Sequence, residues 1–81
     1  MKIKPDSRLF WFFKEDVELD LDEPSHLDMY VQQVWTRGHA SDVRDLLKTV
    51  EIDRLKIVLN RIRRFIPTEV RSFWEDFLGS H

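Results

Sequence analysis

The sequence predicts an all-α fold, a compact bundle of four helices at about residues 24–37, 41–50, 52–65 and 67–78. Apolar residues recur in four stretches at the spacing of a helical face, and proline or glycine falls near the ends of these stretches. The 81 residues include no cysteine, so we expect a single domain over 1–81 without a disulfide framework. Its parts are a frayed end (1–6), an aromatic and acidic arm (7–23) and a helical core (24–79).

The first two predicted helices have clear starts. Pro24 suits the first turn of a helix, and Gly38 is expected to end that helix in the left-handed conformation. Ser41 is expected to act as the N-cap of the second helix. The apolar stripes of the two helices are Leu27, Tyr30, Val31, Val34 and Trp35, and then Val43, Leu46, Leu47 and Val50.

The third and fourth predicted helices meet at Pro67. Proline cannot continue a helix but can open one, and Gly79 is expected to end the fourth. Ile57 is the one apolar residue on the polar side of the third helix, where it is either a scattered surface residue or a contact for the acidic segment. The two predicted core stripes are Leu55, Val58, Leu59, Ile62, Phe65 and Ile66, and then Val70, Phe73, Trp74, Phe77 and Leu78.

The N-terminal arm is ambiguous in its local structure. The run from Leu9 to Phe13 is apolar on every side, so its periodicity does not separate a strand from a short helix. Val17, Leu19 and Leu21 alternate with acids, as in a strand, and residues 14–16 could turn a small hairpin. Because an isolated hairpin is marginally stable in water, we favour an arm that is part extended and part single-turn, packed on the helices by its aromatic residues.

Charge is divided sharply along the chain. The acidic limb, residues 15–28, holds seven acids and no Lys or Arg; the basic cluster consists of Arg54, Lys56, Arg61, Arg63, Arg64 and Arg71. The acidic limb could lie over the basic cluster and neutralise it within the molecule. Alternatively, both charged surfaces could remain available to other molecules.

No residue pattern in the chain indicates catalysis or a cofactor. Histidines 26, 39 and 81 are scattered, and the chain's two glycines suit helix ends rather than a phosphate-binding loop. His26 follows Asp22 and Glu23, but a first-turn surface histidine is a better interpretation than a metal site, which needs three or four converging ligands. We therefore expect a protein with no catalytic residue, metal or cofactor.

The composition favours a protein-binding module. Ten aromatic residues in 81 are many for so small a core, and Trp and Arg often anchor interfaces. With no leader peptide or membrane-spanning run, a cytoplasmic protein without a membrane partner is expected. A protein partner or self-association would use these candidate residues: Arg54, Arg61, Arg63, Arg64, Arg71, Trp11, Trp74, Asp20 and Asp22.

Binding to DNA is the alternative. The second and third predicted helices, joined by a short turn, could form a helix-turn-helix in which the cations contact phosphates or bases. These cations would be Arg54, Lys56, Arg61 and Arg64. The net charge of −2 and the acidic limb oppose this interpretation.

Several short motifs occur in a recognisable order. They are Leu9-Phe10-Trp11, an acidic Asp20-Leu21-Asp22, Val34 followed by Arg37-Gly38, Arg61 with Arg63-Arg64, and Pro67 with Arg71 and Phe73-Trp74, then Leu78-Gly79. The ordered set resembles an uncharacterised family of small bacterial and archaeal helical proteins, often encoded beside nucleotidyltransferase-like toxins of the abortive-infection type. The resemblance implies an antitoxin-like or accessory protein. It supplies no catalytic residue, and Ile66 stands where the family pattern usually has a serine.

Overall fold

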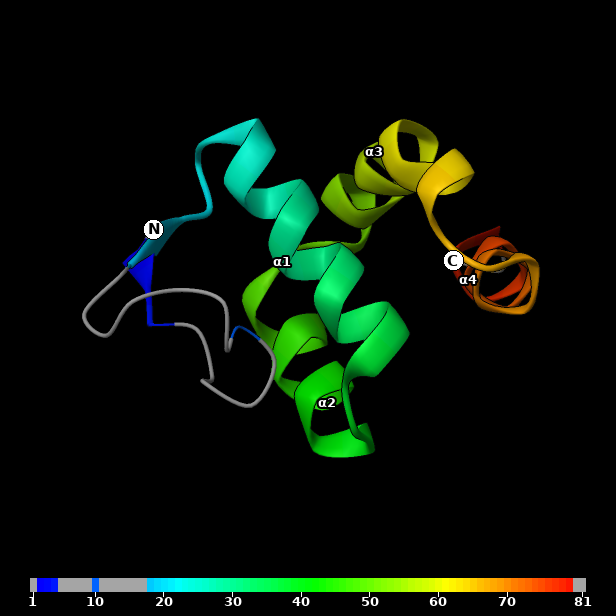
Figure 1. Cartoon of the computed structure of the whole chain (residues 1–81), viewed down its shortest axis with the longest axis horizontal. Helices are drawn as coiled ribbons and strands as arrows, with labels where there is room; N and C mark the ends of the chain where they lie inside the picture. The colour runs from blue at the N-terminus through cyan, green and yellow to red at the C-terminus, as the bar shows by residue number, and fades with distance from the viewer. Residues whose placement is uncertain (1, 5–9, 11–17, 80–81) are drawn as a thin grey trace.

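The fold is mostly helical, as predicted, in a computed structural model that describes residues 2–4, 10 and 18–79. Four α-helices follow a pair of short strands, and the whole measures 36 × 23 × 22 Å (Figure 1). The elements are β1 (Lys2–Ile3), β2 (Leu19–Asp20), α1 (Pro24–Arg37), α2 (Ala40–Thr49), α3 (Ile52–Ile62), the 3-10 helix η1 (Arg63–Phe65) and α4 (Thr68–Gly79). No helix in this described part of the chain has the length and apolar character needed to cross a membrane.

Helix α1 is the central element. It packs against α2, α3 and β2, whereas α4 packs chiefly on α3 at the far end of the long axis (Figure 1). The predicted stripe of α1 is confirmed, because Leu27, Val31, Val34 and Trp35 are buried and Tyr30 is half-buried. The rest of the buried core is formed by Phe10, Leu19, Leu21, Leu46, Val50, Leu55, Val58, Leu59, Ile62, Ile66, Trp74 and Leu78.

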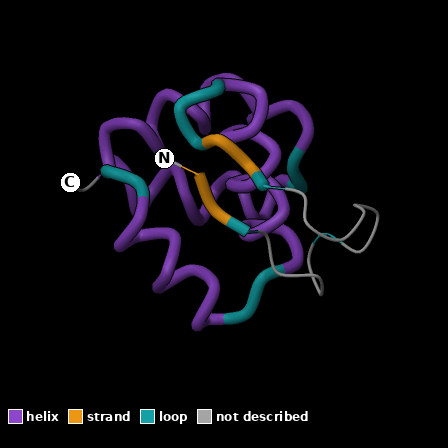
Figure 2. Tube along the Cα trace, turned by 90° about the vertical axis from the view of Figure 1, so that its left-hand side faces the viewer, coloured by secondary structure: helices purple, strands orange, loops and turns teal. Residues whose placement is uncertain are grey.

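Residues 2 and 3 form a short strand, which the sequence did not predict. Residues 1–6 were expected to fray, but Lys2 and Ile3 pair antiparallel with Asp20 and Leu19 (Figure 2). Ile3 packs against the core, and the burial of its side chain offsets the conformational entropy that is lost when this segment is fixed. Leu19 and Leu21 are buried while Glu18 and Asp22 are exposed, so the period-two pattern is confirmed over residues 18–22. Most of the predicted aromatic arm and the 14–16 turn lie outside the described residues.

Gly38 follows α1 for a reason other than the one predicted. Its φ of −77° and ψ of 159° are extended, not left-handed. A Cβ at this position would lie 2.5 Å from the carbonyl oxygen of Val34 and 3.2 Å from the Cβ of Asp42, so only glycine fits without a shift. The tight passage brings α2 against the end of α1.

Helix α2 also begins earlier than predicted. His39 is its N-cap and Ser41 lies inside the helix, so the N-cap assignment of Ser41 was wrong. The backbone N–H of His39 donates to the carboxylate of Asp42 at 2.7 Å, which satisfies a donor at the helix start. The acid of Asp42 therefore fixes a start that the hydroxyl of Ser41 was expected to fix.

The end of α3 determines which aromatic residues are exposed. The α-helix ends at Ile62, and residues 63–65 continue as a 3-10 turn. The backbone of Ile62, with φ of −106° and ψ of 1°, departs from α-helical geometry, so the 3.6-residue repeat no longer sets the direction of the side chains beyond it. Phe65 is 63% exposed, although the predicted stripe had placed it in the core. Ile66 then adopts the extended backbone favoured before proline and is buried.

Helix α4 is anchored by Trp74. Pro67 precedes the helix rather than opening it, and its carbonyl oxygen accepts the N–H of Arg71 at 2.9 Å. The ring of Trp74 stacks on that of Trp35, with centroids 4.5 Å apart and planes 15° from parallel. Phe73, which was also assigned to the core, is 60% exposed because Trp74 occupies the position facing α1.

Candidate functional site

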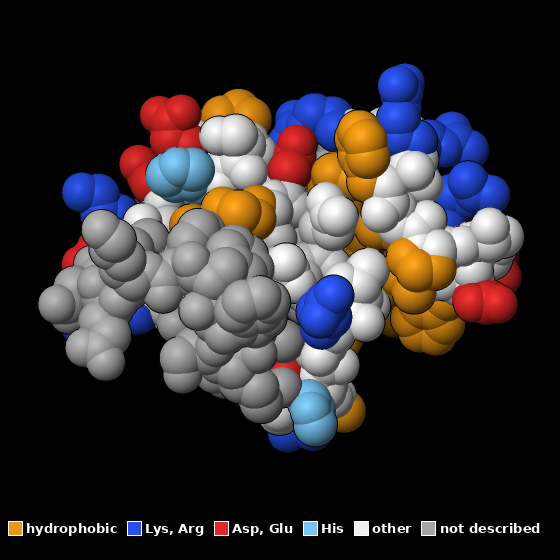
Figure 3. All heavy atoms as spheres, in the orientation of Figure 1, with side chains coloured by type: hydrophobic (Ala, Val, Ile, Leu, Met, Phe, Trp, Pro, Cys, Tyr) orange, Lys and Arg blue, Asp and Glu red, His pale blue; other side chains and the backbone are white. Residues whose placement is uncertain are grey.

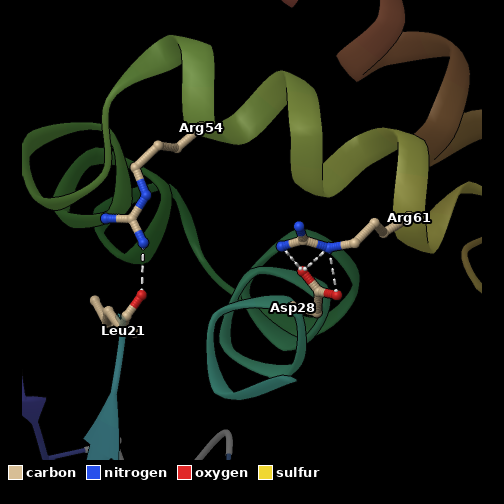
Figure 4. Close-up of polar contacts among 4 residues, drawn as sticks. All are labelled: Leu21, Asp28, Arg54 and Arg61. Atoms are coloured by element: carbon tan, nitrogen blue, oxygen red, sulfur yellow. Dashed lines mark hydrogen bonds and ion pairs between the residues drawn. The ribbon is translucent and has the colours of Figure 1, made fainter. Parts of the chain in front are cut away.

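Two arginines of the basic cluster are engaged by the acidic limb. The guanidinium of Arg54, on α3, donates to the backbone carbonyl of Leu21 at 2.6 Å (Figure 4). Arg61 lies about two turns further along α3, and its guanidinium contacts the carboxylate of Asp28 on α1 (Figure 4). Both contacts join α3 to the acidic limb. The acidic limb therefore does lie over this part of the basic cluster.

The pair of Arg61 and Asp28 is bidentate. Nε of Arg61 lies 2.9 and 3.0 Å from the two carboxylate oxygens, and one terminal nitrogen lies 2.7 Å from Oδ1. These hydrogen bonds to Asp28 favour the charged guanidinium and raise the pKa of Arg61. The charge of Arg61 is thereby neutralised locally, and a partner would have to compete with Asp28 for it.

Arg63 and Arg64 differ from these two. Within the described ranges neither makes an ion pair, and both are exposed on η1. The guanidinium carbon of Arg64 lies 6.0 Å from the ring centroid of Phe65, within reach of a cation–π contact. Figure 3 shows Lys and Arg side chains gathered over the C-terminal end of α3, with hydrophobic side chains exposed beside them.

A groove runs between α1 and η1 beside these residues. We call it the α1–η1 groove; it has a volume of about 380 Å³. Met29, Ile62 and Phe65 form its apolar part, while Asp28, Arg61 and three uncharged polar residues complete the lining. One of these polar residues is Gln33, whose amide oxygen is buried and accepts no hydrogen bond. The groove thus has the exposed ring of Phe65 in its wall, and the exposed Arg63 and Arg64 directly precede that ring in the chain.

The remaining candidates from the sequence fall elsewhere. Arg71 is paired with Glu75 one turn along α4, at 3.3 Å. Trp74 was a candidate for docking, but its side chain is only 4% exposed and it belongs to the core. Trp11 lies outside the described residues. The predicted site residues in the described part of the chain are therefore not brought together as one surface. Asp22, Arg54 and Arg61 line one hollow, whereas Arg63 and Arg64 lie beyond it on η1.

Asp20 and Asp22 shape the turn before α1. The carboxylate of Asp20 accepts the backbone N–H of Asp22 at 3.0 Å. This hydrogen bond to the charged form is the main reason that the pKa of Asp20 lies below its ordinary value. Asp22 is exposed beside Ile57, Arg54 and Arg61 in a hollow of about 130 Å³. Ile57, 54% exposed, is therefore a surface residue beside the acidic limb.

His26 stabilises the same turn. Its Nδ1 accepts the backbone N–H of Asp20 at 3.0 Å, which ties the end of β2 to the first turn of α1. Within residues 2–4, 10 and 18–79, no three His, Asp or Glu side chains converge as a metal site would require. The histidine of this region is thus a structural hydrogen-bond acceptor.

A second, more apolar groove lies between α2 and α4. Its volume is about 490 Å³, and Phe73 and Trp74 line one side of it. Glu69 is the only charged residue in its lining as described. The sequence indicated neither this groove nor the α1–η1 groove, because the stripes placed Phe65 and Phe73 inside. The signal for Phe65 was present in Arg63-Arg64 and Pro67, which mark a helix end.

Comparisons with known proteins add no relative. No family model, no curated protein and no solved structure matches the chain.

Proposed function

We propose that the protein is a non-enzymatic protein–protein interaction module. The observation that carries the proposal is the exposure of Phe65 beside Arg63 and Arg64, which have no carboxylate partner among the described residues. A large aromatic ring flanked by arginines is the composition typical of an interface centre. Intramolecular packing leaves this composition uncovered at the end of α3.

The resemblance to small helical proteins encoded beside nucleotidyltransferase-like toxins suggests the kind of partner. We propose that the chain acts as an antitoxin-like or accessory subunit of such a protein. Arg63 and Arg64 would contact acidic groups on the partner, and Phe65 would be buried on binding. The acidic limb is a weaker candidate for the contact, because Asp20 and Asp28 already accept hydrogen bonds within the molecule.

The structure offers less support for DNA binding. A helix-turn-helix interpretation assigns Arg54 and Arg61 to phosphates or bases, but both guanidinium groups are engaged by the acidic limb. Helix α3 packs chiefly on α1 and α4, so the α2–α3 pair is not the principal packing unit. We therefore place the protein partner first.

Co-purification tests the proposal. The tagged chain would be co-expressed with the product of the neighbouring gene, and the retained partner would be quantified after affinity purification. We expect a stable complex that Arg63→Glu/Arg64→Glu abolishes by opposing charges at the interface. Arg44→Glu/Lys48→Glu, the same charge change on the exposed side of α2, should leave the complex intact.

Three results would count against the proposal. The tagged chain could purify alone as a monomer, or both charge-reversal variants could lose the partner equally. A specific mobility shift on its own promoter DNA, lost with Arg63→Glu/Arg64→Glu, would favour the regulator instead.

A further inference from the structure

We propose that the α1–η1 groove binds an acidic amphipathic segment of a protein partner. An apolar side chain of this segment would pack on Phe65, Ile62 and Met29, while its carboxylates would pair with Arg63 and Arg64. The inference rests on the proposed function for the class of partner and adds the site and the chemistry of the bound segment.

The apolar half of the site is formed by a ring that the fold leaves uncovered. Phe65 is 63% exposed and lies in the groove wall with Ile62, which is itself buried. Covering most of this ring would remove its apolar surface from water and so stabilise a complex. The α1–η1 groove lies between two helical elements, an arrangement that commonly receives the apolar face of a third helix.

The charged half selects the sign of the bound segment. Asp28 and Arg61 both line the groove and neutralise each other through their bidentate pair. Arg63 and Arg64 therefore supply the net charge at this end of α3, and neither has an ion-pair partner among the residues described. A segment with one or two carboxylates would complement this positive charge. The same charge would repel basic segments and so disfavour their binding.

The same features disfavour a nucleic acid at this site. Affinity for nucleic acid grows with the number of phosphates neutralised, and at this end of α3 only Arg63 and Arg64 lack an ion pair among the residues that the structure describes. The carboxylate of Asp28 in the groove wall would in addition repel phosphate. A peptide helix can pack an apolar side chain on the ring of Phe65, whereas a phosphate backbone has no apolar group to place there.

A peptide-binding experiment with the full chain tests the inference. The probe is a fluorescent synthetic helix of about four turns, with leucine and phenylalanine along one face and glutamate elsewhere. One control peptide replaces every glutamate by lysine, and another replaces every apolar residue by serine. Binding is measured by fluorescence anisotropy, and the affected amides are mapped by NMR chemical shifts.

We expect the acidic amphipathic peptide to bind and both control peptides to bind at least tenfold more weakly. Phe65→Ser should weaken binding about tenfold, which corresponds to about 1.4 kcal/mol. Phe73→Ser is the matched control, because Phe73 is an equally exposed aromatic residue outside the α1–η1 groove. It should leave binding unchanged, and the shifted amides should lie in α1 and η1.

The inference is overturned if the lysine peptide binds as well as the acidic one, or if Phe65→Ser and Phe73→Ser act equally. Phe65-dependent binding of an oligonucleotide in preference to the peptide would also overturn it. So would sedimentation showing that the groove is already filled by a second copy. Co-purification of the neighbouring protein that survives Phe65→Ser would sink the site but not the proposed function. Peptide binding without co-purification would do the reverse.

Discussion

At the scale of single residues, the environment of Tyr30 is directly measurable, because it is the only tyrosine in the chain. Its ring stacks with Phe10, with centroids 6.3 Å apart. Burial is the main cause that raises the pKa of Tyr30 above its ordinary value of 10.0, and Asp45 and Asp42 add to the effect. The phenol is thus held neutral by the packing of α1 and by the acids of α2.

We predict that tyrosinate absorbance in the folded protein rises with a midpoint above pH 10.0, whereas the denatured chain titrates near its ordinary value. Because the folded state binds this proton more tightly, the stability contribution is complete below the unfolded pKa. It is lost as pH rises through the folded pKa. Asp45→Asn should lower the folded midpoint. A folded midpoint equal to the denatured one would contradict the packing described for Tyr30.

The two glycines provide a matched pair of positions. A Cβ at Gly38 would meet the Val34 carbonyl at 2.5 Å, whereas one at Gly79 would meet nothing within 4 Å. We expect Gly38→Ala to lower the free energy of unfolding by about 1–3 kcal/mol, as overpacked sites do. Gly79→Ala should be neutral or slightly stabilising. Urea denaturation followed by circular dichroism measures both, and equal effects would show that space at Gly38 is not limiting.

At the scale of whole elements, α4 is held by one aromatic contact more than by its stripe. Trp74 stacks on Trp35 and meets Phe77 edge-on, with centroids 5.3 Å apart. Phe73 touches the same ring from the outside, at 5.3 Å and 85°. Neighbouring residues on one helix therefore carry opposite roles, the first exposed and the second anchoring.

We predict that Trp74→Ala lowers the free energy of unfolding by about 3–5 kcal/mol. Since a domain of this size is marginally stable, Trp74→Phe provides a milder variant in case the first fails to fold. Phe73→Ala should cost no more than about 0.5–1 kcal/mol, because little of its surface is buried. Chemical denaturation monitored at a helical wavelength ranks the three, and a Phe73 effect equal to that of Trp74→Phe would refute the assignment.

Periodicity predicted the helices well because each one buries a stripe. The stripe of α1 and the core positions of α3 up to Ile62 follow the 3.6-residue repeat closely. The prediction failed at Phe65, where the α-helix gives way to a 3-10 turn. It also failed at Phe73, because the apolar stripe of α4 is wider than the surface against which α4 packs. The spacing of apolar residues shows neither where a helix ends nor how wide the surface is that it packs against. The pairing of Lys2–Ile3 with β2 was missed because two-residue strands carry almost no local signal.

The candidate surface was predicted only in part, for a related reason. The sequence located the arginines but could not say which of them the acidic limb would engage. That depended on α1 lying beside α3, which places Asp28 next to Arg61 across 33 residues of chain. Charge on its own predicts that two segments attract, whereas the helix packing decides which carboxylate reaches which guanidinium.

At the scale of the whole molecule, α3 joins the N-terminal part of the chain to α4. Arg54 holds the turn at Leu21, Arg61 holds α1, and the far end of α3 supports α4. The side of α3 that faces the acidic limb is therefore structural, while η1, one turn further along, is exposed. This division separates residues that stabilise the fold from residues available to a partner.

The Arg61–Asp28 pair provides a quantitative test of that division. In a double-mutant cycle with Arg61→Gln and Asp28→Asn, we expect a coupling energy of about 0.5–1 kcal/mol, because the pair is bidentate but partly exposed to solvent. The coupling should shrink in high salt as the charges are screened. Arg64→Gln combined with Asp28→Asn is the control cycle and should show no coupling, since Arg64 makes no ion pair among the described residues. Equal coupling in both cycles would mean that the positive charge at this end of the molecule acts diffusely. The distinction between a structural arginine and arginines free for a partner would then fail.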